Sequence, residues 1–456
     1  MNLVMNAGLI AKALDGELLG ADIEVEGGLS TDSRSISQGD VFIALSGERY
    51  DGHAYLQQVE AKGASLAVVQ TPEQTLDIAQ IKVADSLQAY GQLAGLIRQK
   101  FTGTVFGITG SSGKTSCKEM LVAILSTSGK VHATAANNNN EVGVPLTLSQ
   151  ISTEHDFAVI EMGAGKPDDI GYLIDFAQPN VALVTNVGEA HLELFGSRQS
   201  IAETKKQIYN STSQLQAAVV FGDDELTAQW AVELKARDLA VLSYGLNKHN
   251  DVFASDIESD IAGSAFILNT PNEHIKVQLN VPGKHMVLNA CASAAMALHA
   301  GIELSAIAAG LARYQSIGGR LSIRPLAGWS VIDDSYNANP SSMRAAIDTL
   351  ALAQGRRVLV LGDMAELGPN AAELHREIGE YAKGKVDLWF SAGVMMENAA
   401  AVFGPQANHF ADVASLSDQL FAQLEAGDTL LVKGSRSSRM ERVIAALENH
   451  ITEGVA

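Results

Sequence analysis

A glycine-rich turn carries the strongest chemical signal in the sequence. In GITGSSGKTS (107–116), an apolar strand pattern ends at Thr109 and a helix pattern begins at Lys114. Backbone N–H groups in such a turn converge on phosphate oxygens, the lysine can bridge β- and γ-phosphates, and the next threonine can bind Mg²⁺. The short pattern G-x-x-G-K-T is met, although Ile108 stands where the longer phosphate-loop pattern has its first glycine. An ordinary glycine-rich turn is the alternative to a nucleotide site formed by Thr109, Gly110, Ser111, Ser112, Gly113, Lys114 and Thr115.

Two residues that could bind a metal ion follow other apolar runs. Glu161 lies near the end of FAVIEMG (157–163), and His191 follows VALVTNV (181–187) in a loop or a first helical turn. Ligands of open α/β sheets bind at the carboxyl ends of the strands, so Glu161 is predicted to bind Mg²⁺ directly or through water. A solvated strand-end acid is the alternative. A lone histidine is more often structural, but a position at the same sheet edge makes a metal or phosphate role for His191 credible.

Three other polar segments could either bind ligands or form ordinary surface. VIDDSYNANPSSM (331–343) places acids, a tyrosine and asparagines after a strand pattern, and loops of this composition commonly bind ligands. Its alternative is a turn with Ser341 as a helix N-cap. LVKGSRSSRMERV (431–443) places basic residues beside a helix start, which suits a carboxylate or phosphate, or else forms a basic cap. In IAETKKQIY (201–209), the adjacent lysines favour a solvated helix face on spacing alone.

A mostly parallel sheet would bring the central motifs to one edge. From residue 104 onward, apolar runs alternate with helix patterns, which favours a parallel sheet with helices on both faces. The runs are TVFGIT (104–109), FAVIEMG (157–163), VALVTNV (181–187), AAVVFG (217–222) and AVLSYG (240–245). Alternating segments within 252–281 predict an antiparallel extension of this sheet.

The rest of the sequence predicts two further α/β units. Strand patterns at 41–47 and 65–70 flank a helix pattern, and a linking helix is expected over 86–101. Near the end, a hairpin around Gly328 is followed by strand patterns at 357–362, 387–393 and 429–434. We therefore predict an α/β protein of three domains: a small N-terminal module (1–85), a central P-loop domain (86–315) and a C-terminal Rossmann-like domain (316–456).

Composition excludes several classes of protein. The chain has 456 residues and a net charge of −20, which argues against a general nucleic-acid binder. The two cysteines, Cys117 and Cys291, cannot form a disulfide framework or a thiolate zinc cluster. Neither a signal peptide nor a membrane helix is expected, so we predict a cytoplasmic protein.

Taken together, the motifs resemble those of the Mur ligase family, ATP-dependent ligases that build the peptide stem of bacterial cell-wall precursors. The resemblance covers nearly the whole chain. It is carried by TDSR (31–34), GERYDGH (47–53), GSSGKTS (110–116), NNNNEVGVP (137–145), EMGA (161–164), AHLELFGS (190–197), PGKHMVLNA (282–290), DDSYNANP (333–340), GDMAELG (362–368) and VKGSRSSRME (432–441). DDSYNANP discriminates within the family, because sister amino-acid-adding ligases usually show a DYAHNP-like string there.

The resemblance implies roles for individual residues. Mg²⁺ would bind Thr115, Glu161 and His191, and Lys205 matches the lysine that is carbamylated in the family. Catalysis would involve Lys114, Lys205 and His191. Beyond the turn, ATP would contact Asn289, Arg320, Asp334, Tyr336, Asn337 and Asn339. Substrate would contact Ser33, Arg34, Gly47 and Asn139, with the incoming dipeptide near Lys433, Ser435 and Arg436.

The resemblance also implies an activity. The expected enzyme uses ATP and Mg²⁺, two ions in all, to join D-alanyl-D-alanine to UDP-N-acetylmuramoyl-tripeptide through an acyl phosphate, releasing ADP. It would be a monomer of the bacterial cytoplasm that binds neither nucleic acid nor membrane. Another Mur-type or folylpolyglutamate-synthase-like ligase is the nearest alternative. A P-loop switch or motor would need an Asp-ended strand where this chain has Glu161, and the intact set of candidate site residues argues against an inactive nucleotide-binding regulator.

Overall fold

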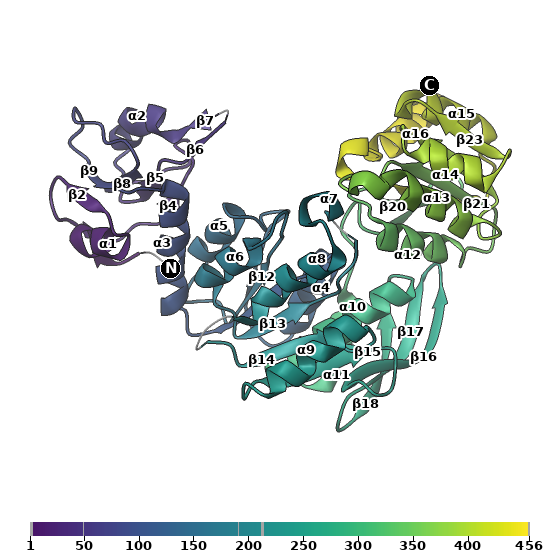
Figure 1. Ribbon diagram of the computed structural model, residues 1–456, viewed down its shortest axis with the longest axis horizontal. Coiled ribbons are helices and arrows are strands. Elements are labelled where there is room, and N and C mark those ends of the chain that lie inside the picture. Colours follow the sequence, from purple (N-terminus) through teal and green to yellow (C-terminus); the bar gives the residue numbers. More distant parts are fainter. Residues whose placement is uncertain (1–2, 49, 190, 211–213, 455–456) are drawn as a thin grey trace.

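Three separate sheets divide the chain into three α/β domains in sequence order (Figure 1). The computed structural model describes residues 3–48, 50–189, 191–210 and 214–454. Two residues of the motifs above, Arg49 and Ala190, lie outside the described residues. In Figure 1 the central domain lies between the N-terminal domain (purple) and the C-terminal domain (green to yellow). The predicted fold class, with three α/β domains, is confirmed.

The N-terminal domain is built on a small, mostly parallel sheet. Its strand order is β2 (Glu17–Leu19), β9 (Ala79–Lys82), β8 (Leu66–Val69), β5 (Val41–Ile43) and β4 (Leu29–Ser30). Around it lie α1 (Ala7–Ala13), η1 (Gly52–Tyr55), α2 (Leu56–Ala61) and two ribbons, β1 (Met5–Asn6) with β3 (Glu24–Val25) and β6 (Ser46–Gly47) with β7 (Tyr50–Asp51). Successive strand residues face opposite layers, so Val41 and Ile43 pack toward α1 while Phe42 packs toward α2.

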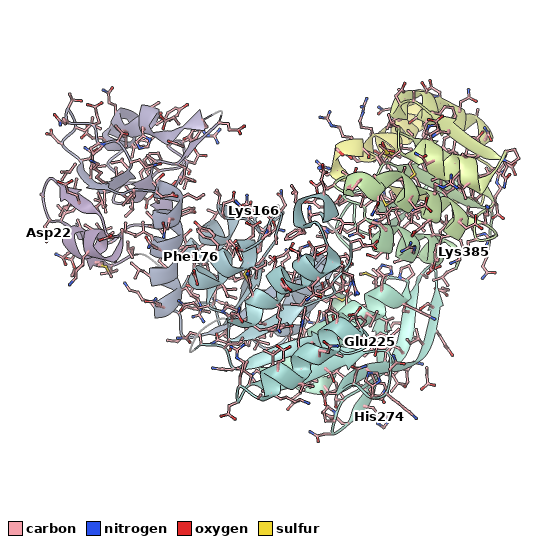
Figure 2. All side chains as sticks on the ribbon, viewed as in Figure 1. Asp22, Lys166, Phe176, Glu225, His274 and Lys385 are labelled. Atoms are coloured by element: carbon pink, nitrogen blue, oxygen red, sulfur yellow. The ribbon has the colours of Figure 1, made fainter. Side chains whose placement is uncertain are left out.

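The linking helix α3 (Ser86–Lys100) belongs to two domains at once. Its Asp85 N-cap accepts hydrogen bonds from Leu87 N and Gln88 N, which satisfies the first turn. Leu93 contributes to the N-terminal core. Gly91 lets the helix approach the ring of Phe176, since a Cβ there would lie 2.3 Å from a ring carbon. Figure 2 shows Phe176 at this contact between α3 and the central domain.

Arg98 fastens the same helix to the central domain. Its buried guanidinium donates to the carbonyls of Ala177, Gln178 and Phe101 and to Asn180 Oδ1, over 2.9 to 3.3 Å. Burial lowers the pKa of Arg98 to about 10, still far above neutral, so the cation remains a donor. The N-terminal and central domains are therefore joined by a buried network. The chain passes into the C-terminal domain through one linker after α11 (Leu304–Arg313), and core residues of the central and C-terminal domains also pack together.

Replacing Arg98 by Met is expected to destabilise this junction. The change removes the side-chain donor from the carbonyls of Ala177, Gln178 and Phe101, whereas Asn180 Oδ1 still accepts from Val105 N. Each unsatisfied group costs on the order of 1 kcal/mol, so about 3 kcal/mol is expected in all. Differential scanning calorimetry should show a lower Tm for the N-terminal and central transitions. The matched control is Arg237→Met, at an exposed position, which should leave the Tm within about 1 °C. If the two variants have the same Tm, the expectation is contradicted.

The central domain carries the longest sheet. The order is β11 (Val131–Ala133), β12 (Phe157–Glu161), β10 (Thr104–Thr109), β13 (Val181–Val184), β14 (Ala217–Phe221), β15 (Ala240–Gly245), β16 (Val252–Asp260), β17 (Gly263–Asn269) and β18 (His274–Leu279). Pairing is parallel from β11 to β16 and antiparallel from β16 to β18, which confirms the predicted extension. The sheet places the ends of β10, β12 and β13 side by side.

Both faces of this sheet are covered, as the apolar runs predict. Phe106 and Ile108 pack with α4 (Lys114–Leu125) and α10 (Lys284–His299). The other face packs against α5 (Gly143–Ser149), α6 (Asp169–Ala177), α8 (Arg198–Lys206), η2 (Gln207–Asn210) and α9 (Glu225–Lys235), and the short helix α7 (Leu192–Phe195) precedes α8.

The C-terminal domain is a second doubly covered sheet. Its order is β19 (Ser322–Leu326), β20 (Trp329–Asp334), β24 (Thr429–Lys433), β21 (Arg357–Gly362), β22 (Leu388–Ala392) and β23 (Ala407–Phe410). One face carries α12 (Pro340–Leu350), α13 (Ala371–Ala382) and α14 (Met396–Phe403); the other carries α15 (Val413–Gln423) and α16 (Glu441–Gly454). Short turns η3 (Gly368–Asn370) and η4 (Arg436–Ser438) follow β21 and β24. The predicted hairpin is present, and Gly328 has a φ of +90° at its turn.

No helix in the described ranges is long and apolar enough to cross a lipid bilayer.

Candidate active site

A cavity of about 940 Å³ lies where the central and C-terminal domains face each other. Most of the predicted site residues line it: Gly110, Ser111, Ser112, Gly113, Lys114, Thr115, Asn139, Glu161, His191, Lys205, Asn289, Arg320, Asp334, Tyr336, Asn337, Asn339 and Lys433. Lys166, which also lines it, lies on the side of the central domain toward the two outer domains (Figure 2). The sheet edge predicted from the strand patterns thus forms one wall, and the third domain forms the other.

The glycine-rich turn is shaped by its neighbours. Gly110 has a φ of +151°, and a Cβ there would lie 1.8 Å from Thr185 Oγ1, so no side chain fits. Gly113 has a φ of +78°, in the left-handed region that favours glycine. Thr185 Oγ1 donates to Ser112 O at 2.6 Å, and Asn186 Oδ1 accepts from Ser112 N at 3.1 Å. These bonds hold the turn open over the start of α4.

Thr185 and Asn186 are functional positions that the sequence analysis missed. They directly follow β13, and their side chains bind the phosphate-loop backbone rather than a ligand. Their position in the sequence could have indicated this role. Polar residues at the carboxyl end of a parallel strand lie at the same sheet edge as Thr109 and Glu161.

Lys114 and Lys205 are two of the lysines that line the cavity and bring positive charge to it. Lys114 donates to Gly110 O at 2.9 Å, and burial lowers its pKa while nearby Glu161 opposes that shift. Lys205, 2% exposed, has its pKa lowered to about 7 by burial and by the charge of Lys114. Within the described residues it has no hydrogen-bond or ion-pair partner. Lys206 points elsewhere and pairs with Glu233, so the solvated helix face expected from spacing holds for Lys206 and is wrong for Lys205.

The Glu161 carboxylate in the cavity wall can accept a cation. Glu161 ends β12 and is 1% exposed. Its Oε1 accepts from Asn139 Nδ2 at 2.8 Å, whereas its buried Oε2 has no hydrogen-bond partner among the described residues. An unpaired buried carboxylate oxygen is costly unless something positive binds it. Because the buried Thr115 lines the same cavity, the residues present fit a hydrated Mg²⁺.

In the part of the chain that the structure describes, no cluster of three or more His, Cys, Asp or Glu side chains could hold a metal ion. Mg²⁺ commonly takes one or two carboxylates together with waters and substrate phosphates, so it does not need such a cluster.

His191 joins the two walls of the cavity. Its Nδ1 forms an ion pair with Glu366 of the C-terminal domain, and Glu193 N donates to Glu366 O at 3.1 Å. Burial lowers the pKa of His191, while the neighbouring carboxylate opposes that shift. Glu366 has a φ of +61°, a backbone conformation that few non-glycine residues adopt without support from their surroundings.

The loop after β20 forms the opposite wall. Asn339 caps α12, since its Oδ1 accepts from Ser342 N at 2.9 Å and Ser342 Oγ accepts from Asn339 N at 3.0 Å. The expectation that Ser341 is the N-cap is therefore wrong, because the capping box starts two residues earlier. The ring of Tyr336 lies under Arg320, 4.0 Å from its Cζ to the ring centroid. Asn289 reaches across from α10 to the phosphate loop, with Oδ1 2.6 Å from the position of a Gly113 Cβ.

Six predicted residues lie away from the cavity lining. Ser33, Arg34 and Gly47 belong to the N-terminal domain, where Arg34 makes a bidentate pair with Asp32 and holds the pKa of Asp32 down to about 2. Ser435 is buried and bonds to Ser437 and Ser438. Arg436 is exposed, with its Cζ 5.8 Å from the Tyr336 ring centroid. Thr109 ends β10 below the turn, fully buried.

The fold and this cavity define a class of enzyme, and the chain belongs to the Mur ligase family. The family models match in three segments: "Mur ligase family, catalytic domain" over 27–96, "Mur ligase middle domain" over 108–297 and "Mur ligase, glutamate ligase domain" over 319–436. A relative from Escherichia coli (strain K12), named UDP-N-acetylmuramoyl-tripeptide--D-alanyl-D-alanine ligase, is 40% identical over 96% of this chain and 97% of its own length. The Bacillus subtilis (strain 168) protein of the same name is 34% identical over 96% and 97%.

Solved structures agree with these matches. A crystal structure of MurF from Acinetobacter baumannii superposes with a TM-score of 0.91 at 36% identity and covers 98% of this chain and 99% of that chain. MurF ligase from Thermotoga maritima in complex with ADP gives 0.85 at 29% identity, covering 94% and 98%. Folylpolyglutamate synthase from Mycobacterium tuberculosis gives 0.64 at 17% identity over 79% and 93%, a likeness of fold alone.

Proposed function

We propose that this chain is an ATP-dependent, ADP-forming ligase that joins D-alanyl-D-alanine to UDP-N-acetylmuramoyl-tripeptide. The reaction completes the pentapeptide precursor of peptidoglycan. The observation that carries the proposal is the cavity itself, which sets the phosphate loop and Glu161 opposite the DDSYNANP loop (333–340). Relatives with this printed name match over nearly their whole length. We propose that the reaction takes place in the cytoplasm, where ATP and UDP-linked precursors are present.

The first step activates a poor electrophile. The terminal carboxylate of the tripeptide attacks the γ-phosphorus of ATP, forming an acyl phosphate and releasing ADP. Negative charge spreads over the phosphoryl oxygens as this happens. The N–H groups of the turn and the Lys114 ammonium face that charge from fixed positions, so little reorganisation is needed when the charge develops.

The second step forms the amide. The amine of D-alanyl-D-alanine attacks the acyl carbon, and the tetrahedral intermediate loses phosphate and a proton. Water would destroy the acyl phosphate, so the cavity must be closed during this step. The C-terminal domain supplies the closing wall, and the His191–Glu366 contact is one place where the two walls already meet.

Mg²⁺ is proposed to be held by Thr115, Glu161 and His191, and when bound it offsets charge on the phosphates. The unpaired Oε2 of Glu161 supports this assignment. Lys205 is proposed to be carbamylated, which would place a second carboxylate-like group in the cavity for a second Mg²⁺. Its burial, its lack of a partner and its lowered pKa support that proposal.

We propose in addition that the enzyme acts as a monomer, since one chain supplies both walls of the cavity. The UDP end of the substrate is assigned to the N-terminal domain near Ser33, Arg34 and Gly47. The exposed strand β6 and the exposed Asp32–Arg34 pair in the turn after β4 support this, because they leave polar groups available at that surface.

A coupled assay of ADP release tests the function. Release is expected only when UDP-N-acetylmuramoyl-tripeptide and D-alanyl-D-alanine are both present with ATP and Mg²⁺. Tripeptides with diaminopimelate or lysine at the third position should be run side by side, with mass spectrometry of the product. Equal ADP release without the dipeptide would point to a nucleotide hydrolase and sink the ligase proposal.

A further inference from the structure

The linker into the C-terminal domain is fastened on both sides of Arg320. Gly319 N donates to Asp333 Oδ2 at 3.1 Å, and Gly319 O accepts from Tyr336 N at 3.0 Å. On the other side, Leu321 N donates to Asp334 Oδ1 at 3.1 Å. Leu321 has a φ of +57°, which is uncommon for a bulky residue and persists only where neighbouring bonds hold it. Arg320 is thus fixed to the C-terminal domain before the first strand of that domain begins.

Lys433 holds the carboxylate that makes this linker bond. Its Nζ lies 2.5 Å from Asp334 Oδ2, 2.9 Å from Asn337 O and 3.5 Å from Asp334 O. A lysine ammonium has three donors, and all three are directed at these oxygens. The side chain is 3% exposed. The ammonium is therefore already satisfied within the protein, unlike that of Lys205.

We propose that Lys433 is a positioning residue for Arg320 and does not bind the dipeptide carboxylate. Lys433 fixes Asp334, Asp334 fixes Leu321 N, and the turn then presents the Arg320 guanidinium over Tyr336 at the cavity wall. Arg320 accordingly travels with the C-terminal domain when the cavity closes on the nucleotide. The kinetic part of this inference rests on the proposed ligase function, whereas the anchoring of the linker does not.

A double-mutant cycle separates positioning from dipeptide binding. Lys433→Met should lower kcat/KM for ATP by about 100-fold, the cost of misplacing a contributing group by about 1 Å, and leave KM for D-alanyl-D-alanine within about twofold. In an Arg320→Ala background, Lys433→Met should lower kcat/KM for ATP by less than about a further threefold. The effects of two residues are not additive when one acts through the other. An independent 100-fold loss in that background, or a dipeptide KM raised about tenfold, would overturn the inference.

The matched control removes an ion pair of the same type from the same domain. Lys385 pairs with Asp348 at 2.5 Å, away from the cavity, and Figure 2 shows it on the C-terminal domain. Lys385→Met should keep all kinetic constants within about twofold, since exposed pairs contribute little.

A double variant that should still fold tests the same inference by hydrogen exchange, without an activity assay. Lys433→Met alone leaves the half-buried Asp334 carboxylate without its counter-ion, whereas Lys433→Met with Asp334→Asn does not. Hydrogen exchange of the full chain should then show the Leu321 amide exchanging at least about tenfold faster than in the parent, while amides of β21 are unchanged. An unchanged Leu321 rate would show that Lys433 does not anchor the linker. This outcome is readable even if the parent chain fails to ligate, so the two proposals fail separately.

Discussion

Lys114→Met is expected to lower kcat/KM for ATP by about 1,000-fold, the largest loss from any single substitution in the cavity. The Lys114 ammonium is partly buried beside the turn and bonds to Gly110 O, so it is held where phosphate charge would develop. Methionine keeps the length and the apolar stem but removes the charge and all three donors. The coupled ADP assay measures the loss, with both co-substrates saturating.

The control for this variant is Lys130→Met in the same domain. Lys130 forms an exposed pair with Glu154 at 3.0 Å, so its loss should change kcat/KM by less than about twofold. Both variants should keep the parent Tm within about 3 °C, since neither changes the packing of the core. If Lys114→Met retains more than about a tenth of the parent activity, the lysine does not act on the transferring phosphoryl group.

Lys205→Ala is expected to cost about 100-fold in kcat, with part of the activity restored by bicarbonate or a short carboxylic acid. With a pKa lowered to about 7, roughly half of the Lys205 amine is neutral at pH 7, against about one part in 3,000 for an ordinary lysine. A neutral amine adds to CO₂, giving a carbamate and releasing a proton. The carbamate would supply oxygens that a small carboxylate can replace in the enlarged cavity of the variant.

The amount of carbamate on Lys205 should decrease as the pH falls. As the pH falls below about 7, the Lys205 amine becomes protonated and can no longer react, so the carbamate should be lost on the acid side. Labelling with ¹³C-bicarbonate should give a carbamate signal by NMR at pH 8 that fades toward pH 6 and is absent in Lys205→Ala.

The neighbouring lysine provides the control here. Lys206 lies on the same turn of α8 but pairs with Glu233 at the surface, so Lys206→Ala should keep full activity and the ¹³C signal. Full activity in Lys205→Ala would remove the carbamate assignment, and loss in Lys206→Ala would mean that the register of the two lysines is reversed.

The central strands could be predicted from their apolar runs, which are almost wholly buried in β10, β12, β13 and β14 and partly buried in β15. The patterns at 104–109 and 240–245 coincide with β10 and β15. In the central and C-terminal domains two strands were not predicted, β11 and β23, and most of the short strands of the N-terminal domain were not predicted either. β11 and β23 are edge strands whose residues are only partly buried, so neither leaves an apolar run in the sequence. The predicted strand at 41–47 ends at Ile43, where the chain turns into the β6–β7 ribbon.

The sequence predicts the parts of the site whose residues are contiguous. It does not predict the contacts between residues that are far apart in the sequence. The turn from Gly110 to Thr115 is contiguous in sequence, so its spacing alone predicts a phosphate site. Lys433 and Asp334 are separated by 99 residues and meet only because β24 and β20 are neighbours in the sheet. Spacing could not distinguish a lysine that binds a ligand from one that is already paired, nor could it choose between Lys205 and Lys206.

The shared helix α3 has a consequence for substrate length. Its 15 residues span about 22 Å and belong to the cores of both the N-terminal and central domains, so the distance between those domains is set by covalent geometry and a buried network. If the UDP end binds the N-terminal domain, as proposed above, the stem peptide would have to span a fixed distance to reach the turn from Gly110 to Thr115. Each residue of extended chain adds about 3.5 Å, so a stem one residue short ends about that far from the phosphates, too distant for in-line attack.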